Sequence, residues 1–191
     1  MNAFWLYLQI GIEHILDPKG IDHMLFIIAL CATYSFNEWK KVLVLVTAFT
    51  IGHSLTLALS ALEIVLIDQE LIETLIPLSI LCTALLNMRN QLPSKLISYQ
   101  YLIALGFGLI HGLGFSNYFK AILMDTENIV SPLFFFNLGI EIGQLVIVLI
   151  FGAFLYLFTH LAKVKQRDWK LVISGAAAGI SLLMILEKIN G

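Results

Sequence analysis

This chain is dominated by long apolar segments, and the short loops between them hold most of its charged residues. A helix needs about 20 apolar residues to cross the hydrocarbon core of a membrane, and several of these segments reach that length. Charged residues make up 13% of the chain, which is roughly half their usual share in a soluble domain. A surface that faces water cannot be built from so few charges. The sequence therefore predicts an all-α integral membrane protein.

The apolar segments predict a bundle of six to seven transmembrane helices in a single domain, residues 1–191. The first segment is short for a full span, reaching about 21 Å at 1.5 Å per residue, so it either tilts or stops inside the membrane. A helix-breaking turn at residues 17–20, which contains Pro18 and Gly20, separates it from the second helix. The expected helices cover residues 3–16, 21–36, 41–62, 71–88, 98–119, 131–161 and 169–189.

The loops alternate in charge along the chain, and this alternation predicts an orientation. The positive-inside rule places loops rich in Lys and Arg in the cytoplasm. The acidic loops, the C-terminus and the turn at residues 17–20 are then expected outside, and the N-terminus inside. The basic loops lie around residues 40–41, 89–95 and 163–170, and the acidic loops around residues 63–73 and 125–127.

Six side chains that can bind metal ions lie within or next to the apolar segments. Ionisable residues are costly inside a membrane and usually face the bundle interior or a water-filled pathway. Counted along their helices, His53, His111 and Glu141 fall at one depth, roughly 12–15 Å below the outer ends. The turn could bring the other three residues down to the same level. The predicted metal site, towards the external side, comprises His14, Asp22, His23, His53, His111 and Glu141.

The donor atoms of this site are imidazole nitrogens and carboxylate oxygens. Such donors suit a divalent transition metal ion, and geometry rather than ligand type would choose among nickel, cobalt, zinc and iron. The methionines are scattered along the chain, which argues against copper(I). We therefore expect nickel, cobalt or zinc.

Polar residues on the third and sixth helices surround the predicted site. The hydroxyl of Ser54, next to His53, can orient an imidazole, bond across helices or bond its own backbone. Asn137, Glu141 and Gln144 recur at i, i+4 and i+7, so one face of the sixth helix is polar through more than a turn. A purely structural polar seam is the other interpretation. We predict that Ser54, Asn137 and Gln144 support the metal ligands.

Glycines on the fifth helix are expected to let a neighbouring helix approach closely. Gly108 and Gly112 have the GxxxG spacing that allows helix backbones to meet in membranes. Close packing would also bring His111 near the ligands of another helix. Gly175 and Gly179 on the last helix are interpreted as packing residues alone.

Three further ionisable residues are not assigned to the site. Glu13 neighbours His14 but lies on another helical face, and His160 lies at the cytoplasmic end beside a basic loop. Asp17 is ambiguous, because it can simply cap the turn before Pro18.

Five sequence blocks surround the predicted site residues, over residues 11–148. The blocks are Gly11-x-x-His14-Ile-Leu, Gly20-x-Asp22-His23-x-Leu-Phe26, Thr47-Ala-Phe-Thr-x-Gly-His53-Ser-Leu-Thr-Leu, Ile110-His-Gly-Leu-Gly-Phe115 and Phe136-Asn-Leu-Gly-x-Glu141-x-Gly-Gln144. They resemble those of the HupE/UreJ membrane proteins and follow the order found in that family. The family is associated with hydrogenase and urease gene clusters and is regarded as one of secondary nickel or cobalt permeases. The resemblance implies a location in the bacterial cytoplasmic membrane and assigns metal handling to the six residues named above.

Three functions are consistent with the sequence, with a metal ion and the lipid bilayer as partners. The first is a permease that takes up a divalent metal ion from outside. The second is a zinc-dependent intramembrane hydrolase acting on a lipid or peptide bond, with Glu141 or Asp22 as general base. The third is a metal-binding sensor or assembly protein without turnover. A gap below the site would favour the permease, and a sealed cytoplasmic half with a lateral opening would favour the enzyme. A net charge of −2 gives no indication of nucleic acid binding, and the oligomeric state is not predicted.

Overall fold

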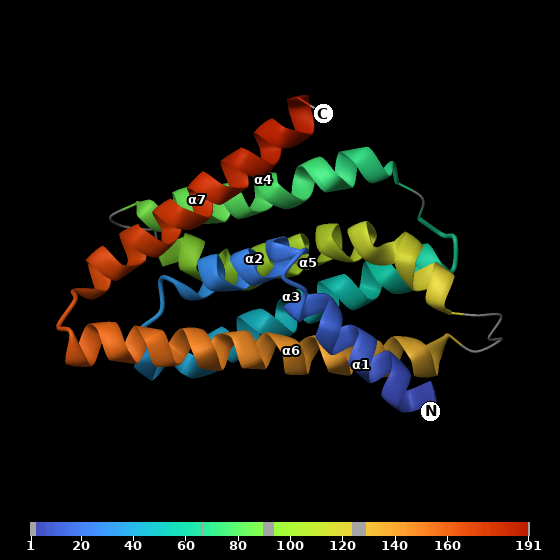
Figure 1. The fold of residues 1–191 in the computed structure, drawn as a ribbon, viewed down its shortest axis with the longest axis horizontal. Coiled ribbons are helices and arrows are strands. Elements are labelled where there is room, and N and C mark those ends of the chain that lie inside the picture. The colour runs from blue at the N-terminus through green and yellow to red at the C-terminus, as the bar shows by residue number, and fades with distance from the viewer. Residues whose placement is uncertain (1–2, 66, 90–93, 124–128, 191) are drawn as a thin grey trace.

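The computed structural model describes residues 3–65, 67–89, 94–123 and 129–190. All regular structure in these ranges is helical, and five helical spans are long and apolar enough to cross a membrane, which confirms the predicted fold class (Figure 1). The helices are α1 (Ala3–Leu16), α2 (Ile21–Cys31), α3 (Trp39–Ala61), α4 (Gln69–Met88), α5 (Ser94–Ile122), α6 (Val130–Tyr156) and α7 (Gln166–Asn190), with a 3-10 turn η1 (Phe36–Glu38) before α3 and a π turn η2 (Leu157–Leu161) after α6.

The helices α1 and α2 together make one crossing of the bundle, which is broken at residues 17–20 (Figure 1). Neither is among the helices long enough to span by itself, since the 11 residues of α2 cover only about 17 Å. The start of α1 lies at the end of α5, where the Tyr7 hydroxyl donates to the Ile122 carbonyl at 3.2 Å. The end of α2 lies at the end of α4, where Asn87 Nδ2 donates to the Ala29 carbonyl at 2.6 Å. The break therefore lies inside the bundle.

This single broken crossing changes the predicted topology. The acidic-loop end of the bundle, where α3 and α5 end and α4 and α6 begin, also holds the start of α1 (Figure 1). Near the C-terminus Lys188 pairs with Glu73 of α4, so α7 ends there too. The opposite end is the basic-loop end. The predictions that the turn lies outside the membrane and that the N-terminus lies with the basic loops are wrong, because α1 and α2 share one crossing instead of making two.

The second helix is also shorter than the predicted range of residues 21–36. It ends at Cys31, and a capping box then starts a new helical segment. The Ser35 backbone N–H donates to the Glu38 carboxylate at 3.0 Å, and the Ser35 hydroxyl donates to the same carboxylate at 3.0 Å. This local signal competes with the apolar run before it and ends the helix early.

Glycines bring α3 and α5 into backbone contact, as the GxxxG spacing predicts. A Cβ atom added at Gly112 would lie 2.3 Å from the His53 carbonyl oxygen, and one added at Gly108 would lie 2.1 Å from another carbonyl oxygen of α3. On α7 the packing interpretation is wrong within this chain. A Cβ atom added at Gly175 or Gly179 would meet nothing within 4 Å.

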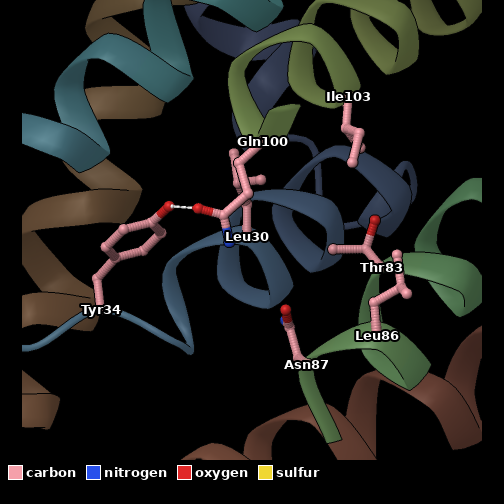
Figure 2. Close-up of a pocket in the computed structure, with 7 residues that line it drawn as sticks. All are labelled: Leu30, Tyr34, Thr83, Leu86, Asn87, Gln100 and Ile103. Atoms are coloured by element: carbon pink, nitrogen blue, oxygen red, sulfur yellow. Dashed lines mark hydrogen bonds between the residues drawn. The ribbon is translucent and has the colours of Figure 1, made fainter. Parts of the chain in front are cut away.

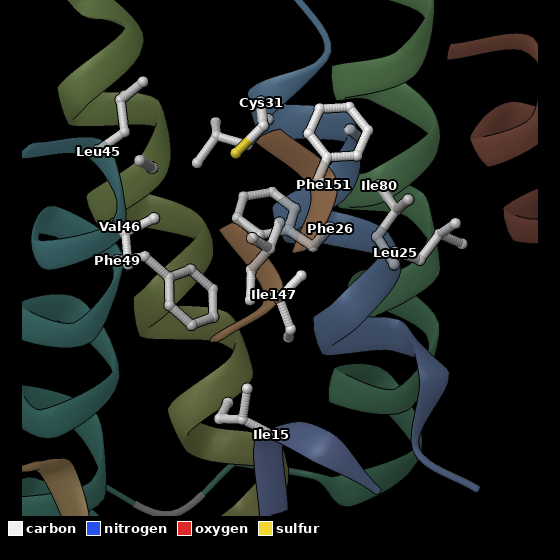
Figure 3. Close-up of a cluster of buried hydrophobic side chains, with 14 of the residues drawn as sticks. Ile15, Leu25, Phe26, Cys31, Leu45, Val46, Phe49, Ile80, Ile147 and Phe151 are labelled. Carbon is white, nitrogen blue, oxygen red and sulfur yellow. The ribbon is translucent and has the colours of Figure 1, made fainter. Parts of the chain in front are cut away.

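A buried apolar core runs through the bundle on both sides of the break, and Figure 3 shows part of it. Phe26 of α2 is fully buried, with its ring centroid 5.2 Å from that of Phe49 on α3. Side chains of α4 and α6, including Ile80 and Ile147, complete this packing. The outer faces carry large apolar residues such as Leu149, which is 71% exposed in the isolated chain. Such faces are suited to contact with lipid.

Candidate metal centre

Four of the five histidines meet inside the bundle, at the level of the break, and we call them the histidine cluster. They come from α1, α2, α3 and α5. The ring centroid of His23 lies 4.5 Å from that of His14, 6.2 Å from that of His53 and 5.1 Å from that of His111. His53 and His111 are completely buried, and His23 is 5% exposed. Residues that are far apart in the sequence thus converge at one point.

The cluster presents ring nitrogens that have no hydrogen-bond partner within the part of the chain that the structure describes. They are Nε2 of all four histidines and Nδ1 of His53. A buried polar atom without a partner costs about 1–3 kcal/mol, so several at one point indicate a ligand. One nitrogen each from His14, His23 and His53 lie within 4.8 Å of one another. Small side-chain shifts would place all three at the roughly 2.1 Å typical of a metal–imidazole bond.

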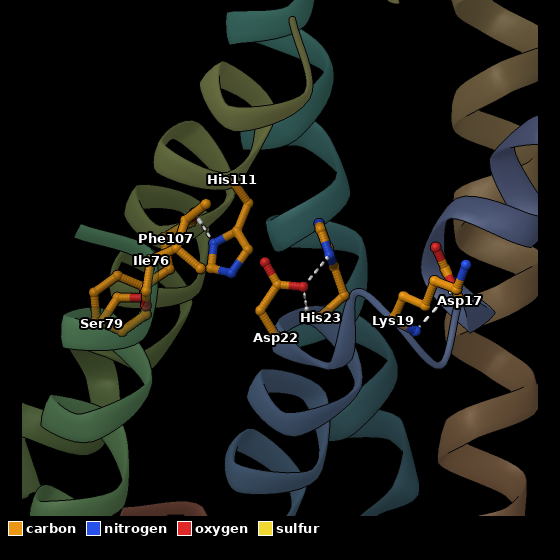
Figure 4. A network of polar contacts seen from close by, with 8 residues as sticks. All are labelled: Asp17, Lys19, Asp22, His23, Ile76, Ser79, Phe107 and His111. Carbon is orange, nitrogen blue, oxygen red and sulfur yellow. Dashed lines mark hydrogen bonds and ion pairs between the residues drawn. The ribbon is translucent and has the colours of Figure 1, made fainter. Parts of the chain in front are cut away.

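Hydrogen bonds orient two of the imidazoles toward the common centre. His23 Nδ1 lies 3.0 Å from the Asp22 carboxylate, and His111 Nδ1 lies 2.8 Å from the Phe107 carbonyl oxygen (Figure 4). Because a carboxylate and a carbonyl can only accept, each Nδ1 carries the proton and leaves the Nε2 lone pair free. Carboxylate and carbonyl partners of this kind are the usual supports of metal-bound histidines. Asp22 therefore acts through His23 in this structure.

The break in the first crossing sets the positions of His14 and His23. His14 lies in the last turn of α1 and His23 in the first turn of α2. Between them, the Asp17 side chain accepts the Lys19 N–H at 2.9 Å, and the Asp17 carbonyl accepts the Gly20 N–H at 3.1 Å. Asp17 thus caps this turn, which is one of the roles that the sequence left open for it. Discontinuous helices of this kind form the substrate sites of many transporters.

Close contact between α1 and α6 fixes the other side of His14. A Cβ atom added at Gly11 would lie 2.1 Å from the Phe136 carbonyl oxygen, and one added at Gly139 would lie 2.2 Å from a carbonyl oxygen of α1. The ring of Phe115 lies 3.7 Å from that of His14 and stacks on Phe136 at 5.1 Å. Aromatic rings thus shield one side of the cluster and restrict access to it.

Glu141 does not belong to the group of three close nitrogens. The Thr47 hydroxyl donates to the Glu141 carboxylate at 2.6 Å, and the Thr50 hydroxyl donates to Gln144 Oε1 at 2.7 Å. Both bonds join α3 to α6. Gln144 is fully buried, and its Nε2 atom has no partner. The two residues hold in place the helix that carries His53.

The two remaining residues of the predicted supporting set bond to their own helices. The Ser54 hydroxyl donates to the Thr50 carbonyl at 2.7 Å, and Asn137 Nδ2 donates to the Leu133 carbonyl at 2.7 Å. Asn137 Oδ1 is buried without a partner. Neither hydrogen bond reaches the histidine cluster.

A cavity of about 610 Å³ lies beside His14 and opens at the surface of the bundle. Its walls come from the second half of α1, the broken segment and the last turns of α5, and they include Phe115. Glu13 and Asp17, which the sequence analysis left outside the site, line the same cavity. A signal for them was present, since acidic residues and non-helical backbone at membrane depth require a water-filled space.

The donor chemistry of the cluster fits a divalent transition metal ion. Neutral imidazoles with a fixed tautomer are the preferred nitrogen ligands of nickel, cobalt and zinc. Asp22 adds a carboxylate next to His23, and three or four imidazoles leave room for water or another ligand. These features do not distinguish between the three metals.

Comparison with known proteins agrees with the sequence motifs. The HupE/UreJ protein family matches residues 1–188 of this chain. No curated protein and no solved structure matches it. The family match covers the broken crossing, the histidine cluster and the polar residues of α6, and it confirms the resemblance found in the sequence blocks. This chain belongs to the HupE/UreJ protein family.

Proposed function

We propose that this protein is a secondary permease for a divalent transition metal ion, nickel(II) or cobalt(II), which binds at the histidine cluster. Membership of the HupE/UreJ family indicates a membrane protein related to the transport of these metals. One observation carries the proposal. Unpartnered ring nitrogens converge at the break of a discontinuous crossing, beside a cavity that reaches the surface. Transporters bind their substrates at such breaks, near the middle of the membrane.

Within this proposal the metal ion is the substrate, and the residues have separate roles. His14, His23 and His53 supply the nitrogens that already lie close together, and His111 supplies a fourth. Asp22 keeps His23 in the metal-binding tautomer. Glu141 remains a candidate ligand, because loss of its bond to Thr47 would free the carboxylate to turn toward the ion.

The ion reaches the cluster through the cavity beside His14. The carboxylates of Glu13 and Asp17 line this cavity, and acidic walls raise the local concentration of cations. By the positive-inside rule the acidic-loop end faces outward. We therefore assign the protein to the bacterial cytoplasmic membrane, with uptake from the external side.

A zinc-dependent hydrolase is the second candidate, and one observation favours it. Three imidazoles with an open coordination position resemble a catalytic zinc site. In this structure both candidate general bases already accept a hydrogen bond, Asp22 from His23 and Glu141 from Thr47, so each would have to act through its other oxygen or give up that bond. Between the cluster and the basic-loop end, the described residues pack as apolar core, and the pocket near that end has a volume of only about 30 Å³. A closed inner half is what the hydrolase predicts, and it is also what a permease shows when it is closed on that side.

Transport can be tested with purified protein in liposomes that enclose a metal-sensitive dye. We expect nickel(II) or cobalt(II) to enter these liposomes faster than protein-free ones, and calcium(II) to be excluded because imidazoles are poor ligands for it. The variant H23A should lose uptake. The variant H160A, which removes the histidine outside the cluster, should keep it.

Other outcomes of this test point to the other functions. Tight zinc binding without uptake, together with cleavage of a lipid or peptide substrate, would replace the permease with the hydrolase. Metal binding with neither uptake nor cleavage would indicate a protein without turnover. Uptake that survives in H23A would exclude the cluster from transport.

A further inference from the structure

A line of buried polar side chains on α4 leads away from the histidine cluster. Ser79, Thr83 and Asn87 lie four residues apart, so they share one face of the helix. They are only 4%, 5% and 6% exposed, in a helix apolar enough to span the membrane. Polar residues inside membrane helices commonly mark substrate pathways. None of these three residues belongs to the histidine cluster or to the cavity beside His14.

The line begins at the level of the cluster. The hydrogen bond from Asn87 to Ala29 fixes the register of α4 against α2, and both helices run toward the basic-loop end (Figure 1). Ser79 precedes Asn87 by eight residues and Asp22 precedes Ala29 by seven, so both lie roughly 10–12 Å nearer the acidic-loop end. Figure 4 shows Ser79 on the side of the network where Asp22 and His111 lie.

The line ends in a small pocket at the basic-loop end (Figure 2). This pocket has a volume of about 30 Å³, and Thr83, Asn87, Tyr34 and Gln100 are among its walls. A space of this size holds about one water molecule. The Tyr34 hydroxyl donates to the Gln100 side chain and joins the segment after α2 to α5. Both partners of this hydrogen bond line the pocket.

The polar groups along this line can guide a cation without retaining it. The Ser79 and Thr83 hydroxyls donate to carbonyl oxygens of their own helix, at 2.7 and 2.9 Å, so their oxygen lone pairs stay available. They are neutral oxygen donors, which bind nickel(II) or cobalt(II) more weakly than imidazoles do. An ion can leave a site only when the following positions bind it weakly. Here the histidine cluster would bind the ion strongly, and the hydroxyls that follow it would bind the ion weakly.

The helix that carries the line can also bend. Pro77 lies two residues before Ser79 and, having no N–H, cannot donate to the Glu73 carbonyl. Prolines are common sites of bending in membrane helices. A bend at Pro77 would move the part of α4 that carries Thr83 and Asn87 relative to α2.

We propose that the metal ion leaves the histidine cluster along Ser79, Thr83 and Asn87, between α2, α4 and α5, and exits past Tyr34 and Gln100 at the basic-loop end. This inference rests on the permease function proposed above and adds the exit half of the pathway. The Tyr34–Gln100 hydrogen bond is its gate, closed in this structure.

The variant T83V tests the exit path, because valine keeps the shape of threonine and removes only the hydroxyl. Initial nickel(II) uptake into liposomes should fall about tenfold, because the moving cation loses one favourable contact with a hydroxyl oxygen. Equilibrium binding of nickel(II) should stay within about twofold of the original protein, since the cluster is untouched. The variant T83S, which restores the hydroxyl, should recover uptake.

The variant S181A is a matched control, because Ser181 of α7 is also a fully buried hydroxyl that bonds its own helix. Its uptake should be unchanged. If T83V does not fold, S79A replaces it with the same expectation. Unchanged uptake in the double variant S79A/T83V would overturn the exit path and leave the permease intact. Failure of the unmodified protein to take up nickel(II) or cobalt(II) would instead refute the permease, and the exit path with it.

Discussion

The cluster depends on how individual histidines are oriented. Two of them have a defined tautomer, His23 through Asp22 and His111 through the Phe107 carbonyl. His53 has no hydrogen-bond partner on either ring nitrogen among the described residues, so no hydrogen bond fixes its tautomer, although its ring is completely buried. A bound ion would do so. The protein therefore fixes the tautomer of His23, whereas a bound ion would fix that of His53. Single substitutions can measure these two effects separately.

The first prediction concerns Asp22. The variant D22N removes the carboxylate charge that supports the His23 Nδ1 proton, and we expect nickel(II) affinity to fall about 10- to 100-fold. Titration calorimetry of the purified protein measures this change. The variant D168N, which alters an exposed carboxylate in the first turn of α7, should bind as before. Equal affinity in D22N would mean that Asp22 does not act through His23.

At this scale the sequence predicted that histidines from different helices would lie close together. The depth of His53 and His111 along their helices indicated a shared level, and in the structure both rings lie close to that of His23, with centroids 6.2 and 5.1 Å away. The sequence could not predict the hydrogen bond between Glu141 and Thr47, because that contact depends on how α6 is rotated against α3. Helical spacing shows which residues share a face but not which neighbouring helix that face meets.

The elements are held together by backbone contact at glycines. α3 and α5 meet at Gly112 and α1 and α6 meet at Gly11 and Gly139, and these two helix pairs carry three of the four clustered histidines. The geometry of the cluster therefore depends on how closely these helices approach. The GxxxG spacing of Gly108 and Gly112 predicted the contact between α3 and α5. Gly175 and Gly179 have the same spacing, but a Cβ atom added at either would meet nothing within 4 Å.

The second prediction compares two glycines. The variant G112A adds a Cβ atom 2.3 Å from the His53 carbonyl oxygen, so α3 and α5 must separate. Overpacking of this kind costs about 1–3 kcal/mol, which lowers Tm by roughly 2–4 °C per kcal/mol at this chain length. Nickel(II) affinity should fall as well. Thermal unfolding in detergent and metal titration measure the two effects.

The control for this prediction is G175A, whose added Cβ atom meets nothing within 4 Å. Its Tm should be equal or slightly higher, because alanine favours helix more than glycine does. If G175A lowered Tm as much as G112A does, the decrease would result from replacing glycine by alanine in a helix and not from the α3–α5 contact.

For the whole molecule, the broken crossing decides the topology. Segment length showed that α1 is short, but a short segment can lie at a membrane surface or form half of a crossing. The sequence also did not show that α2 ends at Cys31, since the apolar run continues past that point. Only the long-range bonds of Tyr7 and Asn87 establish that α1 and α2 lie end to end.

The third prediction follows from this topology. Epitope tags at the N-terminus and at the C-terminus should be accessible from the same side of the membrane, the external side by the positive-inside rule. Antibody labelling of intact spheroplasts, compared with inverted vesicles, measures this directly. Tags on opposite sides would mean that α1 and α2 cross separately.

The central claim is that one divalent metal ion binds at the histidine cluster inside the membrane. Its most direct test is the metal content of purified protein after equilibration with nickel(II), measured by mass spectrometry for the original chain and for H53A, H111A and H160A. The account predicts one ion per chain, lost in H53A and H111A and retained in H160A. An original chain without metal, or H53A and H111A with undiminished metal, would contradict it.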